Sequence, residues 1–420
     1  MAEVLSIIEH ESIPIVDERN PGDRSIEAKH AQALSNLNTI PGNAYSWGHR
    51  CVKWSQYCGL VNLGDLTLEI LPKIHGKESN PGACREALVR MLRKAGLFKI
   101  HKPGSASINF QKHTLLDIFI HDFCQQLNRQ LVQGALRQYV SRDENLAVLK
   151  GKLLSHKQFR HNLAHKERLY CQYDELSEDI LINQIIKYTL RLLLPKTRST
   201  LIKNDIIQLL YAFDEVADRQ VSSKEVDQLS LNRSENRFEE IIRLCSIFIQ
   251  ALNPGTGAGD LKSFSLMFDM NQLFESWVAA TLKPLAFKYG WRLKEQGPKR
   301  FMAYRHDIDR PVFQMRPDIS FLDQSGKTVL IVDTKWKLLA PEEAKLGISQ
   351  ADMYQMQAYG NRYGVRLLCL VYPKQSGCEG KYILSINGDA PSSISVNSIL
   401  VESNQDKSFI SGLESFIRGA

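Results

Sequence analysis

The chain has 420 residues, enough for two or three domains, and its 43% hydrophobic and 24% charged residues are typical of a soluble globular protein. Its formal net charge of +7 favours a polyanionic partner only mildly, because the excess is small for this length. The N-terminus lacks a basic segment followed by an apolar core, and no run of about 18 apolar residues occurs, so we expect a cytoplasmic protein without a membrane segment.

The cysteines do not follow a metal-binding pattern. None belongs to a CxxC pair or to a Cys/His spacing typical of zinc, so we expect reduced thiols, as in cytoplasmic proteins. The eight positions are Cys51, Cys58, Cys84, Cys124, Cys171, Cys245, Cys369 and Cys378.

The segment 1–82 predicts a β-rich N-terminal domain. Short apolar runs are broken by Asn, Gly, Pro and Asp, and Leu66, Leu68 and Ile70 alternate with polar residues as in a half-buried strand. The polar sequence HGKESNPG at 75–82 ends this pattern.

Helical periodicity begins at Ala83, and we expect a helical middle domain over 83–253. Within it, the sequence 114–140 predicts a long amphipathic helix, because apolar residues recur at steps of four: Leu115, Phe119, Phe123, Leu127 and Leu131. The loop NPGTGAGD at Asn253–Asp260 is the clearest break in the chain.

The most basic stretch of the chain is LKGKLLSHKQFRHNLAHKERL at 149–169, with six lysines and arginines against one acid. Two interpretations remain open: a solvated helix face, or a surface that follows DNA phosphates. Its histidines lack the acid of an HExxH motif, so we expect no zinc site. The candidate DNA-binding residues are Lys150, Lys152, Lys157 and Arg160.

The segment 260–420 predicts an α/β domain built on a small mixed sheet. A helix over 267–286 is followed by strands near residues 316 and 329, a helix over 349–363 and a strand over 365–373. An order of α, β, β, α, β is typical of such a unit. The complete chain is therefore expected to be a multidomain α+β protein.

The sequence RPDISFLDQSGKTVLIVDTK at 316–335 predicts a β-hairpin, because two apolar runs flank the turn-forming residues DQSG. If the turn is centred on 325–326, Asp318 lies opposite Asp333, and opposite residues share a sheet face. Lys335 lies two positions beyond Asp333 and joins them on that face.

Two carboxylates held this close repel each other unless a cation lies between them, and hard oxygen ligands suit Mg²⁺ or Mn²⁺. A lysine beside such a metal could orient or deprotonate the attacking water, or stabilise charge that develops on a phosphate. The spacing therefore suggests metal-dependent phosphodiester hydrolysis. The alternative is that Asp318 and Asp333 are ordinary strand-end residues and Lys335 an exposed cap.

This segment resembles the PD-(D/E)xK nuclease signature, with Pro317-Asp318 as its first half and Asp333-Thr334-Lys335 as its second. The resemblance implies that both aspartates are metal ligands and that Lys335 is the catalytic lysine. It also draws in three secondary residues: Glu275 on the preceding helix, and the QxxxY pair of RecB-like members on the following helix, Gln355 and Tyr359.

Further segments resemble the McrC family over nearly the whole chain: LGDLTLEILPKI at 63–74, REALVRML at 85–92, GALRQYVSRDENLAVLKGKLL at 134–154, YDELSEDILINQIIKYTLRLL at 173–193 and LMFDMNQLFESWV at 266–278. McrC proteins are nuclease subunits of modified-cytosine restriction systems and act with a McrB-like AAA+ GTPase.

That resemblance implies an N-terminal part that engages the GTPase, and a C-terminal domain that cuts double-stranded DNA carrying 5-methylcytosine with Mg²⁺. GTP would be used by the partner, which agrees with the lack of a GxxxxGK[ST] loop in these 420 residues. One acid-acid-lysine set per chain predicts that two copies act together in the assembled complex when a duplex is severed.

Two other functions remain open. A stand-alone repair or recombination nuclease would use the same site, with the helical domain as its DNA clamp, and would cut with Mg²⁺ and no GTP. A non-catalytic activator subunit would carry a vestigial nuclease fold, although the intact set of Asp318, Asp333 and Lys335 argues against it.

Overall fold

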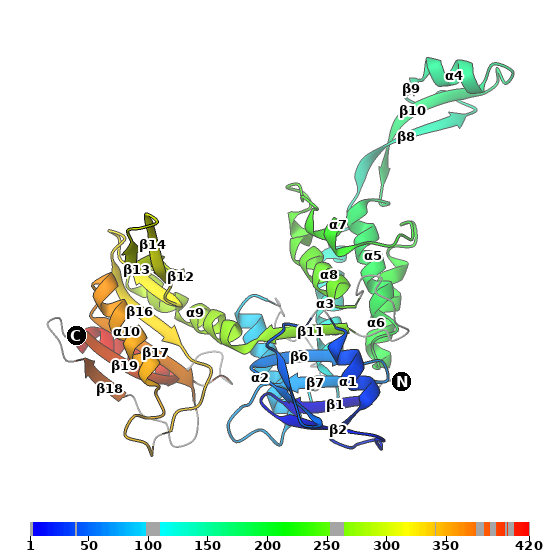
Figure 1. Ribbon diagram of the computed structural model, residues 1–420. Helices are drawn as coiled ribbons and strands as arrows, with labels where there is room; N and C mark the ends of the chain where they lie inside the picture. Colours follow the sequence, from blue (N-terminus) through cyan, green and yellow to red (C-terminus); the bar gives the residue numbers. More distant parts are fainter. Residues whose placement is uncertain are drawn as a thin grey trace. The chain divides into compact units, whose positions relative to one another are not determined.

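The computed structural model describes residues 3–37, 40–97, 110–252, 264–340, 342–374, 382–386, 392–399, 401 and 407–419. The chain is a mixed α/β protein with several separate sheets, and it forms two compact units: residues 1–115 with 259–420, and residues 116–258 (Figure 1). Within the described ranges no helix combines the length and apolar character needed to cross a membrane. The loop expected at Asn253–Asp260 lies outside these ranges, as does Cys378.

The N-terminal segment is rich in strands, in agreement with its sequence pattern. One sheet has the order β1-β7-β6-β11 and a second the order β3-β2-β5-β4. The elements are β1 Glu3–Ile8, β2 Ser12–Val16, β3 Ile26–Glu27, α1 Ala28–Ser35, β4 Tyr45–Gly48, β5 Cys51–Trp54, β6 Tyr57–Asn62, β7 Leu66–Leu71 and α2 Pro81–Lys94.

The outermost strand of the first sheet, β11 (Phe264–Asp269), comes from the other end of the chain and pairs antiparallel with β6. A glycine makes this approach close: a Cβ on Gly59, whose φ is +144°, would lie 2.0 Å from the carbonyl oxygen of Leu266. Because only a residue without a side chain fits there, Gly59 allows β11 to join the N-terminal sheet.

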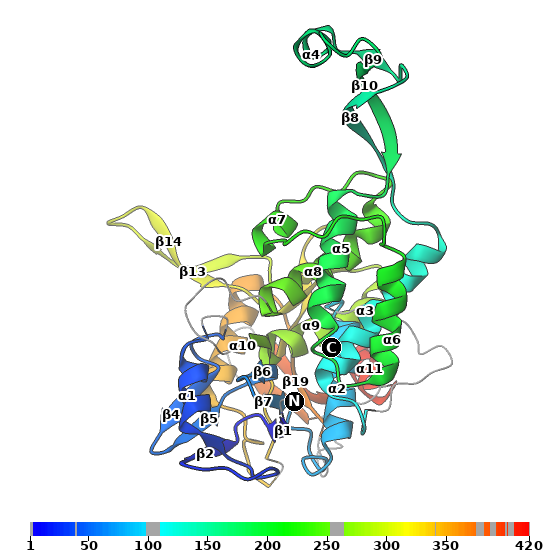
Figure 2. The ribbon, with the colours of Figure 1, turned by 90° about the vertical axis from the view of Figure 1, so that its right-hand side faces the viewer.

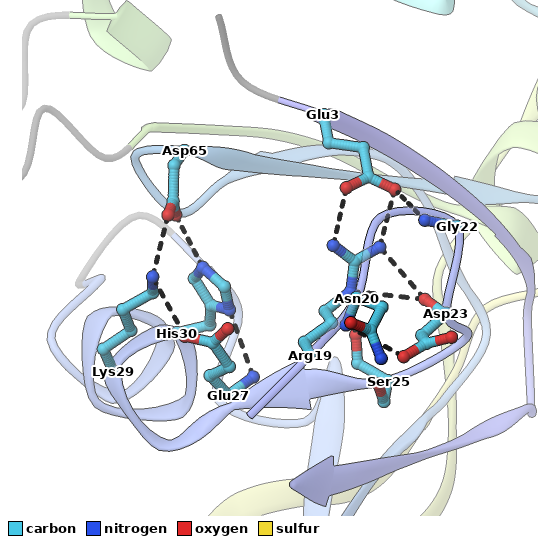
Figure 3. Close-up of polar contacts among 10 residues, drawn as sticks. All are labelled: Glu3, Arg19, Asn20, Gly22, Asp23, Ser25, Glu27, Lys29, His30 and Asp65. Carbon is cyan, nitrogen blue, oxygen red and sulfur yellow. Dashed lines mark hydrogen bonds and ion pairs between the residues drawn. The ribbon is translucent and has the colours of Figure 1, made fainter. Parts of the chain in front are cut away.

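Arg19 fastens the loop between β2 and β3 to the first strand (Figure 3). Its guanidinium donates two hydrogen bonds of 2.7 Å to the carboxylate of Glu3 and one of 2.9 Å to the carbonyl of Ser25. The backbone N–H of Gly22 donates to Glu3 as well, at 2.8 Å. A bidentate arginine of this kind fixes both partners in direction as well as distance, so the loop has one orientation against β1.

Asp65, in the turn between β6 and β7, holds helix α1 in place (Figure 3). Its carboxylate oxygens lie 2.8 Å from Nζ of Lys29 and 2.6 Å from Nε2 of His30. The hydrogen bonds of these two side chains lower the pKa of Asp65 to about 2. The carboxylate is therefore ionised throughout the physiological pH range and anchors α1 to the sheet.

A buried ion pair joins the N-terminal sheet to the helices that follow it. Glu69, fully buried in β7, accepts hydrogen bonds of 2.8 and 2.7 Å from the guanidinium of Arg85 on α2. The hydroxyl of Ser6 donates to the same carboxylate at 2.6 Å, and the backbone N–H of Leu115 at 2.8 Å. Because four donor groups satisfy this carboxylate, its burial is tolerated.

The second compact unit consists of helices and an extended antiparallel arm (Figures 1 and 2). The arm, which we define as residues 138–177, contains β8 Gln138–Leu146, β9 Lys152–Leu153, α4 Ser155–His161 and β10 Leu169–Ser177. The other elements are α3 Leu115–Val132, α5 Leu181–Leu193, α6 Thr200–Tyr211, α7 Ser223–Asp227, the 3₁₀ helix Asn236–Phe238 and α8 Glu239–Leu252.

The helix expected over 114–140 is therefore too long by two turns, and the middle segment is not purely helical. Helix α3 ends at Val132, because Gly134 adopts a left-handed φ of +99° that stops helical hydrogen bonding. The following sequence QYVSRDENL then pairs as β8 with β10 along its full length.

The C-terminal segment forms a mixed sheet, as expected, of order β12-β15-β16-β17-β19-β18. β16 is antiparallel to β15 and parallel to β17. A separate two-stranded ribbon of β13 and β14 is an addition that the sequence did not predict. The elements are α9 Met270–Lys288, β12 Arg292–Glu295, β13 Arg300–Arg305, β14 Arg310–Met315, β15 Ile319–Leu322, β16 Thr328–Thr334, α10 Gln350–Tyr363, β17 Leu367–Pro373, β18 Tyr382–Ile386, β19 Ser392–Ile399 and α11 Lys407–Gly419.

The Glu69–Arg85 pair yields a stability prediction. Glu69→Ala should lower the free energy of unfolding by about 3–5 kcal/mol, because it leaves a buried guanidinium without its partner. Thermal and urea unfolding of the full chain measure the change. The control is Glu86→Ala, which removes the exposed i,i+4 partner of Arg90 and should cost about 0–1 kcal/mol. Equal losses in the two variants would contradict a structural role for the buried pair.

Candidate active site

The hairpin of β15 and β16 has the register expected from its sequence. Ile319 pairs with Val332 and Phe321 with Leu330, so one further step places Asp318 opposite Asp333. The register shifts only between Phe321 and Leu322, where a β-bulge places one extra residue in β16 before the turn. The two acids therefore face each other where β16 ends and β15 begins.

Asp333 is completely buried on β16. Burial, and then the charge of Asp318, raise the pKa of Asp333 to about 7. Nζ of Lys335 lies 2.6 Å from its Oδ2, but neither carboxylate oxygen accepts a well-directed hydrogen bond from any described residue. Asp333 is thus a buried carboxylate whose oxygens have acceptor capacity left for a cation.

Hydrogen bonds hold both the side chain and the backbone carbonyl of Asp318. Its Oδ2 accepts hydrogen bonds of 2.8 Å from the backbone N–H and from the hydroxyl of Thr334. Its carbonyl accepts one of 2.7 Å from the N–H of Gln296. Burial raises the pKa of Asp318, although the bonds from Thr334 and the charge of Lys335 act in the opposite direction. These bonds set the orientation of the carboxylate.

Lys335 is the positive centre of the site. Besides Asp333, its Nζ lies 3.1 Å from Oε1 of Gln355 and 3.8 Å from Oδ1 of Asp352. Nζ of Lys337 donates a hydrogen bond of 2.5 Å to the other carboxylate oxygen of Asp352. Burial disfavours the charged ammonium, but the nearby carboxylates, Asp333 above all, outweigh it and raise the pKa of Lys335. The side chain is therefore a cation at neutral pH.

Helix α10 brings two of the expected secondary residues to the site. Gln355 donates from Nε2 to the hydroxyl of Tyr359 at 2.9 Å, and Tyr359 donates to the carbonyl of Arg316 at 3.3 Å. Burial, followed by the charge of Asp333, raises the pKa of the Tyr359 phenol, which keeps it neutral. A continuous chain of hydrogen bonds thus runs from Lys335 to the backbone that precedes Asp318.

Glu275 enters the site from helix α9, which is capped by the side chain of Asp269. Its carboxyl accepts a hydrogen bond from Nε2 of Gln296. Burial, and then the charge of Asp318, raise the pKa of Glu275 to about 7. Three acids therefore interact electrostatically at this end of the sheet.

The sequence interpretation missed two residues of the site. Asp352 carries a signal, because Ser349 and Asp352 form a capping box at the start of α10 and place a carboxylate one turn before Gln355. Gln296 carries none: it lies in a turn with a left-handed φ of +52°, and only the folded chain shows its contact with Glu275.

The acids fit a magnesium ion better than a metal that needs a complete protein cage. Among the described residues no group of three or more His, Cys, Asp or Glu side chains is arranged to hold a metal. Mg²⁺, however, binds through one or two carboxylates and completes its shell with water and substrate phosphate. Asp318 and Asp333 supply such a pair, with buried oxygens on Asp333 that lack hydrogen-bond donors.

The predicted DNA-binding residues lie elsewhere, on the arm of the second compact unit. Two of them already have partners: Nζ of Lys150 lies 3.7 Å from the ring centre of Tyr173, and Nζ of Lys157 lies 2.5 Å from Asp143. The basic stretch is thus not a helix face, since only Ser155–His161 is helical. The four candidate DNA-binding residues belong to a different compact unit from Asp318 and Asp333. They are Lys150, Lys152, Lys157 and Arg160.

Solved structures with a similar fold come from Thermococcus gammatolerans. A chain from a refined half-complex of a tetradecameric assembly of McrB AAA+ hexamers with bound McrC has a TM-score of 0.74 and 19% identity, and the match covers 98% of this chain and 99% of that chain. A chain from the McrBC complex has a TM-score of 0.51 and 22% identity, with 66% and 87% covered. At these identities the likeness shows a shared fold. No curated protein sequence matches at a significant level.

A protein-family model identifies the family of this chain. The model described as McrBC 5-methylcytosine restriction system component matches residues 52–373, which is more than half of the chain. The matched range contains the hairpin acids, Lys335 and helix α10. It also agrees with the McrC-like segments recognised in the sequence. The chain therefore belongs to the McrBC 5-methylcytosine restriction system component family.

Proposed function

We propose that this chain is a McrC-like endonuclease subunit that hydrolyses DNA phosphodiesters with Mg²⁺, or with Mn²⁺ in its place. The observation that carries the proposal is the convergence of Asp318, Asp333 and Lys335 at the ends of β15 and β16. Two buried acids and an adjacent cation are costly to the fold, and functional sites are where such costs concentrate. Membership of a restriction-system family supports DNA as the substrate of this chemistry.

In this proposal Asp318 and Asp333 hold the metal. Bound Mg²⁺ supplies Lewis acidity to the scissile phosphodiester. Lys335 stabilises negative charge on the phosphate, because a lysine whose pKa is raised keeps its proton and acts as a cation rather than as a base. Gln355 positions the ammonium through its 3.1 Å contact, and Tyr359 fixes Gln355 in turn.

Glu275 is the proposed proton acceptor or third oxygen ligand beside this pair. A carboxyl with a pKa of about 7 exchanges a proton readily near neutral pH, which suits a group that assists the attacking water. The side chain of Gln296 donates to this carboxyl while its backbone N–H donates to the carbonyl of Asp318, so the same residue holds both acids.

The partner in this proposal is a McrB-like AAA+ GTPase, and GTP is used by that partner. Two observations support it: the similar Thermococcus assembly is described as McrB AAA+ hexamers with bound McrC, and the 420 residues here contain no phosphate-binding loop. The substrate is double-stranded DNA carrying 5-methylcytosine. The N-terminal segment 1–82 engages the GTPase, and two copies of the C-terminal segment 260–420 sever the two strands within the assembled complex.

Loss of cleavage should be separable from stimulation of the partner. Asp318→Asn, Asp333→Asn and Lys335→Ala should each lower cleavage of methylated duplex DNA by about a hundredfold or more, since each removes a metal ligand or a charge stabiliser. Stimulation of GTP turnover by the partner should persist in all three. The assay measures both activities in parallel.

The matched control is Glu343→Gln, an exposed acid between β16 and α10 that should retain both activities. Cleavage by any of the three variants at the level of the unmodified chain would place the active site elsewhere. Robust cleavage by the purified chain with Mg²⁺ and no GTPase would instead support a stand-alone nuclease, and intact GTPase stimulation without any cleavage by the unmodified complex would support a non-catalytic activator.

Magnesium binding is testable without an activity assay. Mg²⁺ should raise the melting temperature of the full chain, because a ligand that binds only the folded state stabilises it by mass action, by about 2.7 kcal/mol at a hundred times Kd. Asp333→Asn should remove this Mg²⁺-dependent increase. A melting temperature that responds equally to Mg²⁺ in both proteins would show that these carboxylates do not bind the ion.

The arm is the proposed surface for DNA phosphates or an acidic partner surface. Lys157→Glu combined with Arg160→Glu should weaken duplex binding and flatten its salt dependence, because each phosphate contact contributes about 0.9 to the log–log slope. Asp143→Asn serves as the control: it removes the ion-pair partner of Lys157 while keeping both basic residues. An unchanged slope in the charge-reversed protein would leave the arm as a solvated surface.

A further inference from the structure

The ribbon formed by β13 and β14 stands apart from the sheet that carries the catalytic hairpin. It comprises residues 300–315, and its strands pair with each other and with no other described strand. It extends outward from the C-terminal segment (Figure 2). The second strand ends at Met315, so only two residues, Arg316 and Pro317, separate the ribbon from Asp318 of the candidate active site.

The base of the ribbon is fastened to α10, the helix that also carries Gln355 and Tyr359. Arg362 donates from Nε to the carbonyl of Phe301 at 2.7 Å, and Arg300 donates to the carbonyl of Arg362 at 2.7 Å. The hydroxyl of Tyr363 donates to the carbonyl of Met315 at 3.1 Å. The ribbon therefore projects from a fixed base rather than from a free loop.

Large apolar side chains on the ribbon face solvent. Phe313 is 73% exposed and Met302 57%, and Tyr304 and Ile308 are also exposed. Phe313 adopts a left-handed φ of +57°, which is unfavourable for a bulky residue, and its rung opposite Met302 is missing from the strand pairing. The left-handed backbone of Phe313 and the exposed apolar side chains of the ribbon both destabilise the folded chain, and no packing against other described residues compensates for this.

The ribbon and its flanks are basic. Residues 299–316 contain five lysines and arginines and two acids, a formal excess of three positive charges. Arg305 is paired with Asp307 at 2.8 Å, whereas Lys299 and Arg310 form no ion pair with any described residue. Exposed aromatic and aliphatic groups interleaved with unpaired positive charge are the composition of a nucleic-acid surface.

A groove lies between the ribbon and α10. Its volume is about 450 Å³, and it is lined by Met302 and Met315 from the ribbon and by Tyr354, Gln357, Asn361 and Arg362 from the helix. Tyr354 is adjacent in sequence to Gln355, which contacts Lys335. One residue that lines the groove is therefore the sequence neighbour of a residue that contacts Lys335.

We propose that the β13–β14 ribbon, with the groove beside it, binds the DNA duplex next to the catalytic centre. The inference rests on the proposed nuclease function and adds where the substrate is held. A two-stranded ribbon fits the major groove of B-DNA. Six residues per strand at about 3.3 Å each give a length of about 20 Å, sufficient to cross that groove. Phe313 and Tyr304 contact sugars and bases, and Lys299 and Arg310 contact phosphates.

Charge favours DNA over a protein as the occupant. A protein-binding hairpin needs apolar surface but no net positive charge, whereas the ribbon combines both and leads directly to two metal-binding carboxylates that require a phosphodiester within reach. In this arrangement the duplex is oriented by the ribbon before the phosphate meets Asp318, so the ribbon residues act in positioning and not in catalysis.

Photocrosslinking tests the proposal directly. The photoreactive residue p-benzoylphenylalanine replaces Phe313 in the full chain, which is assembled with its partner GTPase and a labelled methylated duplex, with Ca²⁺ in place of Mg²⁺ to keep the DNA intact. Irradiation should give a covalent adduct that disappears on DNase treatment. The matched control carries the same residue at Phe287, an 89% exposed phenylalanine on α9, and should give no DNA adduct.

A second variant checks the energetics. Phe313→Ser with Arg310→Glu should raise the Kd of the full chain for duplex DNA about tenfold, while Phe287→Ser with Arg292→Glu should leave it unchanged. An adduct with the partner protein, or no adduct at position 313 together with an unchanged Kd, would overturn the proposal. Failure of the unmodified complex to cut DNA with Mg²⁺ would instead overturn the nuclease function, and the adduct would still report whether the ribbon binds DNA.

Discussion

The mutual repulsion of Asp318 and Asp333 is the physical constraint around which the C-terminal segment is organised. Burial raises the pKa of both carboxyl groups, and the charge of Asp318 raises the pKa of Asp333 further. Lys335 offsets part of that cost at 2.6 Å from Asp333, and Thr334 satisfies Asp318. The oxygens of Asp333 still lack directed hydrogen-bond donors among the described residues, and this is the feature on which the proposed metal site rests.

The surrounding structure keeps this unfavourable arrangement from relaxing. β16 is hydrogen-bonded on both sides, so the backbone that carries Asp333 cannot shift. Helix α10 fixes Lys335 through Gln355. Trp336, the next residue, donates from Nε1 to the buried carboxyl of Glu9 at the end of β1, at 2.9 Å. Burial raises the pKa of Glu9 to about 7. Glu9 is therefore another buried carboxyl whose ionisation is unfavourable.

Contacts between distant segments make the N-terminal sheet part of the same compact unit as the hairpin of β15 and β16. β11 adds to the N-terminal sheet immediately before α9 delivers Glu275, and Lys94 of α2 lies over the ring of Trp277 on that helix. The N-terminal sheet is therefore connected physically to the helix of Glu275 through β11, and to the residue after Lys335 through the hydrogen bond of Trp336 to Glu9.

The sequence alone predicted the hairpin of β15 and β16 and the register that places Asp318 opposite Asp333, because strand alternation and turn position are local and fix which side chains share a face. It also predicted helices α9 and α10, but the helix expected over 267–286 began too early: residues 267–269 end strand β11, and the side chain of Asp269 caps α9, which begins at Met270. Tertiary structure decided what local patterns do not encode. The strands of the arm and the ribbon are mostly exposed and bury only a few side chains, among them Cys171, Tyr173 and Met315, so their sequences lack a sustained apolar alternation. Gly134 ended the helix that the apolar steps of four had predicted to continue. Gln296 joined the site through its contact with Glu275, and Glu9 met Trp336 from the other end of the chain, because only the folded protein brings such residues within hydrogen-bonding distance.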